Sequence, residues 1–251
     1  EQREEGQEGE GSEVTAMLYR ALFALGLSVV GALAADEVLT DKSAPSKVLA
    51  LYQKTLAAAR KDPPAPGAVI CIGSSHMQLW KGVQADLAPL TVHNYGIGGS
   101  RMTQAEEYFI DNLAIAFKPR AVILYEGSND INAGTKPATV LASFQQLHRK
   151  LHAALPEARL YVLGVVPSPG KRFDKFAELK QVNELLRAEC ATQPWMKFID
   201  TTTPLLGADG QPREELFKPG DIHMVPAGYA VWKSVIAPVI VPIEKPFEKA
   251  K

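Results

Sequence analysis

Two adjacent serines, Ser74 and Ser75, follow a run of strand-forming residues in the stretch VICIGSSH, residues 69–76. A serine hydroxyl at the end of a buried strand commonly caps the next helix, because its oxygen accepts hydrogen bonds from the free N–H groups of the first turn. It can also act as a nucleophile if a base accepts its proton. The tripeptide Gly73-Ser74-Ser75 alone favours the cap, so the choice depends on the partners that the rest of the chain supplies.

Three further segments contain residues that suit a nucleophilic serine. They are NYGIGGSRM with Gly96, Gly98 and Gly99, YEGSNDI with Asn129 and Asp130, and FKPGDIHM with Asp221 and His223. An imidazole can take the proton of a serine hydroxyl, and amide or glycine N–H groups can stabilise the oxyanion that forms. Each segment also has an ordinary interpretation, an Asx turn for Asn129 and Asp130 and a simple loop histidine for His223.

Five short apolar runs must position these residues. They lie at 68–72, 91–96, 121–127, 159–166 and 197–200, and helical patterns separate most of them. The clearest helical pattern, 138–155, has a buried stripe formed by Val140, Phe144, Leu147, Leu151 and Leu155. Another helix is predicted at 46–61, before the helix-breaking DPPAPG. This alternation predicts a parallel sheet covered on both faces, with ligands at the carboxyl ends of the strands.

Taken in order, the four polar segments resemble the conserved blocks of the SGNH, or GDSL-type, esterase and lipase family. The resemblance covers the chain from about Ala68 to Val241. It implies an α/β fold with three layers, α/β/α, around a flavodoxin-like five-stranded parallel sheet. It also implies that Ser75 is the catalytic nucleophile, that His223 is the general base, and that Gly99 and Asn129 form the oxyanion hole.

The acidic residue of the catalytic set departs from the family pattern. Members usually have an aspartate three positions before the histidine, where this chain has Gly220; its acid is Asp221, two positions before His223. In an extended segment this shift would turn the carboxylate away from the ring. Glycine can adopt backbone angles closed to other residues, so Gly220 can re-aim the turn. We expect Asp221 to hold the imidazole, with a backbone carbonyl as the alternative.

Composition and charge exclude several other classes of protein. Apolar residues make up 46% of the 251 residues, enough for one sizeable core, and the formal net charge of -1 gives no basic field for nucleic acid. The only two cysteines, Cys71 and Cys190, are too few for a disulfide framework or a zinc site, and we expect both to be buried.

No metal or organic cofactor is implied. The glycines near position 98 do not form a dinucleotide-binding loop, because Arg101 stands where the pattern needs a glycine. His148 and His152 are spaced i, i+4 on one helix, but Arg149 replaces the glutamate of the zinc-protease pattern. We expect these two histidines to form a solvated edge beside the apolar stripe.

A pattern in the first part of the chain predicts that the protein is exported. Residues 17–34 have a short basic start, an uncharged apolar run and the small-residue sequence Ala-Leu-Ala, as in a secretory signal peptide. The run is shorter than a membrane-spanning helix needs, so no permanent membrane anchor is expected and the protein is expected to be secreted or periplasmic. Residues 1–16 are interpreted as a non-native or disordered acidic extension, the alternative being an acidic tail on a cytoplasmic protein. A helical arm (35–67) and the hydrolase domain (68–251) complete the predicted organisation.

The sequence therefore predicts a serine hydrolase that cleaves small carboxylic esters through an acyl-enzyme, with short acyl groups favoured and an acetylated carbohydrate, a lipid or a xenobiotic as the open choices of natural substrate. Two alternatives use the same scaffold. One is an exported, non-catalytic carbohydrate-binding protein, and the other is a thioesterase or acyltransferase with the same residues. Neither the natural alcohol nor the oligomeric state follows from the sequence.

Overall fold

The computed structural model describes residues 46–248 of the chain. The predictions for the upstream extension 1–16 and the signal peptide 17–34 lie outside these residues, as does the beginning of the arm predicted at 35–67.

A five-stranded parallel sheet forms the centre of the described part of the chain. Its strands are β1 (Val69–Gly73), β2 (Val92–Gly96), β3 (Ala121–Tyr125), β4 (Arg159–Leu163) and β5 (Met196–Ile199). They are arranged in the order β2-β1-β3-β4-β5, with Gly73 of β1 in register with Gly96 of β2 and Tyr125 of β3. This is the flavodoxin-like order, and it confirms the predicted sheet.

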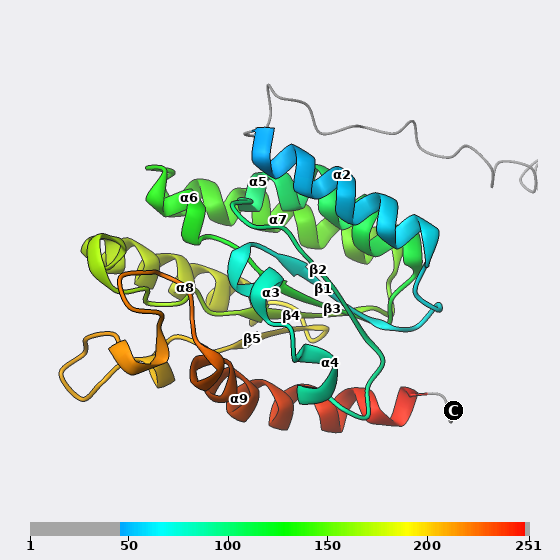
Figure 1. The fold of residues 1–251 in the computed structure, drawn as a ribbon. Coiled ribbons are helices and arrows are strands. Elements are labelled where there is room, and N and C mark those ends of the chain that lie inside the picture. The colour runs from blue at the N-terminus through cyan, green and yellow to red at the C-terminus, as the bar shows by residue number, and fades with distance from the viewer. Residues whose placement is uncertain (1–45, 249–251) are drawn as a thin grey trace, which may run out of the picture. The chain divides into compact units, whose positions relative to one another are not determined.

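Helices cover both faces of the sheet, as Figure 1 shows. One face carries α2 (Ser46–Lys61), the π-helix η1 (Ala105–Ala114), α7 (Pro137–Ala154) and α8 (Phe176–Cys190), and the other carries α3 (Ser75–Leu79), α4 (Val83–Asp86) and α9 (Pro226–Glu244). Short helices α5 (Met102–Gln104), η2 (Ile115–Phe117), α6 (Ser128–Asn132), η3 (Gly170–Lys175), η4 (Thr203–Leu205), η5 (Glu214–Leu216) and η6 (Lys245–Phe247) lie in the connections. The predicted three-layer fold is therefore confirmed.

The central strands β1 and β3 are apolar throughout because both of their faces are buried, whereas the edge strands β2 and β5 contain polar residues such as Asn94 and Lys197. Along β1, Ile70 and Ile72 pack against the α2, α7 and α8 layer, whereas Val69 and Cys71 pack against the α3 and α9 layer. Cys71 and Cys190 are both buried free cysteines, as expected. Burial raises the pKa of each thiol, that of Cys190 to about 12, so both remain protonated and act as small apolar side chains.

The last long helix is apolar because one side of it completes the core. By length and composition, the segment Pro226–Phe247 could cross a membrane. In the fold, Trp232, Ile236 and Ile240 of α9 are fully buried against the sheet, and Glu244 accepts hydrogen bonds from Arg159, at the beginning of β4, and from Tyr161. One side of α9 is therefore part of the core, and its other apolar side chains are half-buried or exposed.

The prediction of a solvated pair of histidines on α7 was wrong for His148. This side chain is buried, and its Nε2 atom lies 2.9 Å from a carboxylate oxygen of Glu189 on α8. His152 is exposed and stacks on Trp195. The i, i+4 spacing placed both histidines near one helix face but did not reveal that α8 covers the first of them.

Candidate active site

Ser75 is the first residue of α3, directly beyond the carboxyl end of β1. The turn requires glycine at position 73, which has φ +151°, because a Cβ there would collide with the carbonyl oxygen of Tyr125. Ser74 occupies the cap position of α3, and its side chain makes no capping hydrogen bond. The helix-cap interpretation therefore fails for Ser75, whose hydroxyl is directed to another partner.

That partner is His223, from the loop before α9. Its Nε2 atom lies 3.0 Å from Ser75 Oγ, although 148 positions separate the two residues in the chain. The loop is fixed on both sides of the imidazole: the Lys218 N–H donates to the His223 carbonyl at 2.9 Å, and Phe217 pairs with Met224 in an antiparallel bridge. The serine and the imidazole thus come together on two short, anchored segments.

Asp221 reaches the far side of the same imidazole. Its Oδ1 atom lies 2.9 Å from His223 Nδ1, and Gly220 adopts the left-handed conformation with φ +69°. Burial opposes the charged carboxylate and is the largest single effect, but the Ile222 N–H bond and the attraction of His223 together outweigh it and lower the pKa of Asp221. The side chain is 41% exposed. Of the two arrangements considered from the sequence, the structure has the one with the aspartate at the ring.

The candidate oxyanion donors lie beside Ser75 at the ends of β2 and β3. A Cβ added to Gly98 would lie 3.7 Å from Ser75 Cβ, which places the loop after β2 against the serine. Within residues 46–248, the N–H of the next residue, Gly99, has no hydrogen-bond partner. Asn129, the second residue of α6, donates from Nδ2 to the Ser100 carbonyl at 2.9 Å. The Ser75 N–H belongs to a first helical turn, whose N–H groups lack intrahelical acceptors.

Two buried carboxyl groups, those of Glu126 and Asp130, lie next to these donors, and no pattern in the sequence indicated that either would be buried. Glu126 is 1% exposed and accepts a hydrogen bond from the Ser100 hydroxyl. Burial and the neighbouring Asp130 raise the pKa of Glu126 well above its usual value. Asp130 accepts the Met102 N–H at 3.1 and 3.2 Å, and burial raises its pKa to about 6. Asp130 therefore joins α6 to α5, beyond the local turn considered from the sequence.

Two basic residues at the site, His76 and Arg172, were also given no role from the sequence. His76 is buried; its Nε2 atom lies 3.1 Å from the Ile222 carbonyl in the histidine loop. Burial, followed by repulsion from His223, lowers the pKa of His76 to about 3. Arg172, from η3 after β4, lies within 3.4 Å of Asn129. The only sequence signals were that His76 adjoins Ser75 and that Arg172 follows a predicted strand at the same sheet edge.

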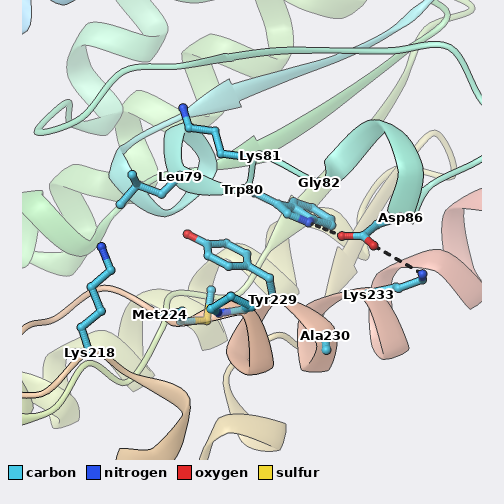
Figure 2. Close-up of a pocket in the computed structure, with 11 residues that line it drawn as sticks. Leu79, Trp80, Lys81, Gly82, Asp86, Lys218, Met224, Tyr229, Ala230 and Lys233 are labelled. Atoms are coloured by element: carbon cyan, nitrogen blue, oxygen red, sulfur yellow. Dashed lines mark hydrogen bonds and ion pairs between the residues drawn. The ribbon is translucent and has the colours of Figure 1, made fainter.

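Two open pockets flank the histidine loop. An apolar pocket of about 510 Å³ lies between α3 and α9, and Figure 2 shows the rings of Trp80 and Tyr229 within it and Lys81 and Lys218 at its edge. A polar pocket of about 670 Å³ lies on the other side of the loop. Its lining includes Arg172, Asp221 and Ile222, together with further charged residues from three segments: Lys171, Glu214, Glu215 and Lys218. The polar pocket is thus the one that touches partners of both His223 and Asn129.

No metal site is evident in the part of the chain that the structure describes. Within residues 46–248, no group of three or more His, Cys, Asp or Glu side chains is arranged to hold a metal ion.

A flavodoxin-like sheet with a histidine-bonded serine at its carboxyl edge is typical of a hydrolase that uses a serine nucleophile. Comparison with known proteins identifies the family. Residues 66–231 match the model of the GDSL-like Lipase/Acylhydrolase family, so the chain belongs to this family and is a hydrolase acting on esters. The resemblance seen in the sequence is confirmed.

Individual relatives support this assignment. The chain is 28% identical to the human platelet-activating factor acetylhydrolase IB subunit alpha1 over 178 residues, which are 68% of this chain and 73% of the relative. A GDSL-like lipase from Bacteroides thetaiotaomicron has a similar fold, with a TM-score of 0.66, 17% identity, and coverage of 76% of this chain and 98% of the other. A carbohydrate esterase family 3 structure from Talaromyces cellulolyticus gives a TM-score of 0.53, 16% identity, and coverage of 72% and 99%.

Proposed function

We propose that the protein hydrolyses esters of short acyl groups with a polar alcohol, such as an acetylated sugar, through an acyl-enzyme on Ser75. The observation that carries the proposal is the continuous chain of contacts from Ser75 Oγ through His223 to Asp221, at 3.0 and 2.9 Å. A serine hydroxyl is a weak nucleophile until a base takes its proton, and this chain supplies base and orienting acid together.

In the first half of the reaction, Ser75 Oγ attacks the ester carbonyl while its proton moves to His223 Nε2. The carbonyl oxygen becomes negative, and the N–H groups of Ser75 and Gly99 and the Asn129 amide donate to it. The tetrahedral intermediate then collapses. The bond to the alcohol breaks, and the proton on His223 passes to the leaving oxygen, so the alcohol departs neutral and the acyl group stays on Ser75.

In the second half, water replaces the alcohol. His223 takes a proton from the water as its oxygen attacks the acyl carbon, and the same three donors stabilise the second oxyanion. Collapse breaks the bond to Ser75 Oγ, which recovers the proton from His223. The acid is released and the enzyme returns to its starting state, with Asp221 holding the ring in one orientation throughout.

The polar pocket supports a polar alcohol. Arg172 and Asp221, the partners of the two catalytic segments, both line it, and half of its lining residues are charged. Charged walls suit the hydroxyl groups of a sugar better than an alkyl chain, because they can form hydrogen bonds with the ligand. Neither Ser75 nor His223 lines either pocket; the apolar pocket between α3 and α9 is lined by Leu79 and Met224, whereas the polar pocket is lined by Asp221, the partner of His223.

A substrate panel tests the proposal. Nitrophenyl esters from acetate to palmitate, acetylated sugars and a matched thioester are assayed with the wild type and with Ser75→Ala, and Ser74→Ala serves as the control. We expect turnover of acetate esters and acetylated sugars to exceed that of palmitate and of the thioester. Ser75→Ala should abolish turnover of all these esters, and Ser74→Ala should retain it. Preference for the thioester, or transfer to an added alcohol in place of hydrolysis, would instead support the thioesterase or acyltransferase alternative.

A matched pair of variants tests which of the two pockets binds the alcohol part of the substrate. Lys171→Trp places a bulky ring at the polar pocket, and Ala230→Trp does the same at the apolar pocket. We expect Lys171→Trp alone to lower kcat/KM for the acetylated sugar, with little effect on nitrophenyl acetate. The reverse pattern would move the alcohol to the apolar pocket.

We further propose that the enzyme acts outside the cytoplasm. The proposal is supported by the signal-peptide pattern of residues 17–34. Acetylated sugars of extracellular polymers would be accessible to the enzyme in that compartment.

A further inference from the structure

Arg172 approaches the active site from a segment that nothing in the reaction above uses. It lies on η3, after β4, and the neighbouring Lys175 donates from Nζ to the Ile131 carbonyl at 3.3 Å. Ile131 belongs to α6, the same short helix that carries Asn129. The η3 segment is therefore attached to the element that presents one of the three oxyanion donors.

The guanidinium of Arg172 contacts the amide oxygen of Asn129. Its two terminal nitrogens lie 3.3 and 3.4 Å from Asn129 Oδ1, and on the other side of the amide Nδ2 donates to the Ser100 carbonyl at 2.9 Å. Arginine can only donate and a carbonyl can only accept, so the two neighbours require the same orientation of the amide. A flipped amide would lose both contacts. One N–H of Nδ2 is then left for a ligand.

The charge on Arg172 has no acidic partner in the described part of the chain. Between residues 46 and 248, no carboxylate lies within 4.0 Å of this guanidinium. The side chain is half-buried, and burial lowers the pKa of Arg172 from its usual value. Within these residues, the guanidinium therefore places a cation without an ion-pair partner beside the amide of Asn129.

We infer that Arg172 is a positioning residue of the oxyanion hole, acting through Asn129. It fixes the orientation of the amide, and by bonding to Oδ1 it draws electron density from the amide and makes the remaining N–H a stronger donor. The inference rests on the proposed function. Because the ester carbonyl is neutral before attack and negative afterwards, the benefit grows as charge develops. Arg172 should therefore affect kcat more than KM.

The test is a double-mutant cycle with nitrophenyl acetate, a neutral substrate. The variants are Arg172→Met, Asn129→Ala and their combination, and Lys180→Gln is the control because it removes an exposed cation from the beginning of α8, outside the polar pocket. We expect Arg172→Met to lower kcat about tenfold or more with KM changed less than about twofold. In the Asn129→Ala background, the same change should lower kcat less than about twofold, and Lys180→Gln should match the wild type.

Two further measurements separate positioning from loss of structure. Arg172→Lys should recover part of kcat, because lysine restores a donor and the charge but not the two N–H groups that contact the amide oxygen together. Added guanidinium ion should partly restore the kcat of Arg172→Ala. If the arginine variants had lost activity by unfolding, neither lysine at position 172 nor added guanidinium ion would restore kcat. Additive losses in the double variant would overturn the inference, as would a raised KM with unchanged kcat.

Ser75→Ala, assayed on the same ester, keeps the two proposals distinguishable. If Ser75→Ala is inactive while Arg172→Met matches the wild type, this inference alone fails. If Ser75→Ala retains turnover, the proposed function fails and the inference fails with it.

Discussion

Asp221 Oδ1 lies 2.9 Å from His223 Nδ1, although the aspartate stands two positions before the histidine and not three. The left-handed turn at Gly220, with φ +69°, precedes the aspartate, whose carboxylate also accepts the Ile222 N–H at 2.6 Å. The turn brings the acid back over the imidazole. A spacing one residue shorter than is usual in the family is thus compatible with an aspartate at the ring.

The first prediction concerns this acid. Asp221→Ala should lower kcat on an activated ester by ~10²-fold or more, because the imidazole loses its orienting partner. The loss should stay below the ~10⁴-fold measured for a buried triad aspartate, because water reaches the 41% exposed side chain of Asp221. Retention of a tenth or more of wild-type kcat would show that the enzyme works as a serine–histidine dyad.

The turn itself can be tested separately. Gly220→Val should also lower kcat, because a β-branched residue strains a left-handed conformation, whereas Gly220→Asn should be tolerated since asparagine adopts it more readily. No atom lies within 4 Å of a Cβ at position 220, so a difference between the two variants reports backbone conformation and not a steric clash.

Asn129→Ala should lower kcat by ~10²-fold or more with little change in KM, because its hydrogen bond to the substrate oxygen strengthens only as charge develops. Steady-state kinetics on nitrophenyl acetate measure both constants. A rise in KM with unchanged kcat would assign Asn129 to ground-state binding.

The stability of the fold should depend on pH through His76. The folded protein holds this ring neutral, with a pKa near 3, while the unfolded chain takes up a proton near pH 6.5. The unfolded state therefore binds more protons between these values. The stability that His76 contributes is complete above about pH 6.5 and falls by ~1.4 kcal/mol per pH unit below about 6.

Urea unfolding at pH 7 and pH 5 measures this contribution, with His76→Gln as the comparison because glutamine can still donate to the Ile222 carbonyl. The wild type should lose ~2 kcal/mol more than the variant on acidification, which is the slope of one proton over the ~1.5 pH units between the unfolded pKa and pH 5. Asp130 has the opposite sign, since its pKa is raised to about 6, but it titrates in both proteins and cancels in the difference. Equal losses would show that His76 does not titrate on unfolding.

Export gives another prediction. Expressed from Met17 in a host with a secretory pathway, the protein should be recovered outside the cytoplasm with Ala35 as its first residue. Ala34→Phe should block processing, because a large residue occupies the small-residue cleavage position. N-terminal sequencing of the exported protein decides the matter, and an intact Met17 would contradict the prediction.

The sequence predicted the strands and the residues at their ends because these depend on local features. The central strands are short runs of β-branched and apolar residues, and the glycines, serine and asparagine that follow mark where the runs stop. Parallel strands bring their carboxyl ends to one edge, so Ser75 and Asn129 could be expected near each other. The choice between Asp221 and a backbone carbonyl as the partner of the imidazole stayed open in the sequence, because it depends on the backbone angles of one turn.

Contacts between distant segments were the part that could not be predicted. His76 meets the Ile222 carbonyl across 146 positions, and Arg172 meets Asn129 across 43. Neither pair has a periodicity or a motif that links it. Burial was equally hidden for Glu126, which follows a strand like any polar residue at a strand end, and for His148, which is covered by a helix distant in sequence.

Covalent labelling of Ser75 tests the central claim most directly. The protein is treated with an organophosphonate that carries a nitrophenyl leaving group, and its intact mass and the mass of the peptide containing residues 69–76 are measured. We predict one label per chain, attached to Ser75, at a rate that falls in His223→Ala and is retained in Ser74→Ala, with turnover lost in proportion to labelling. An unlabelled Ser75 in a protein that still hydrolyses the ester, or full activity after complete labelling, would contradict the account.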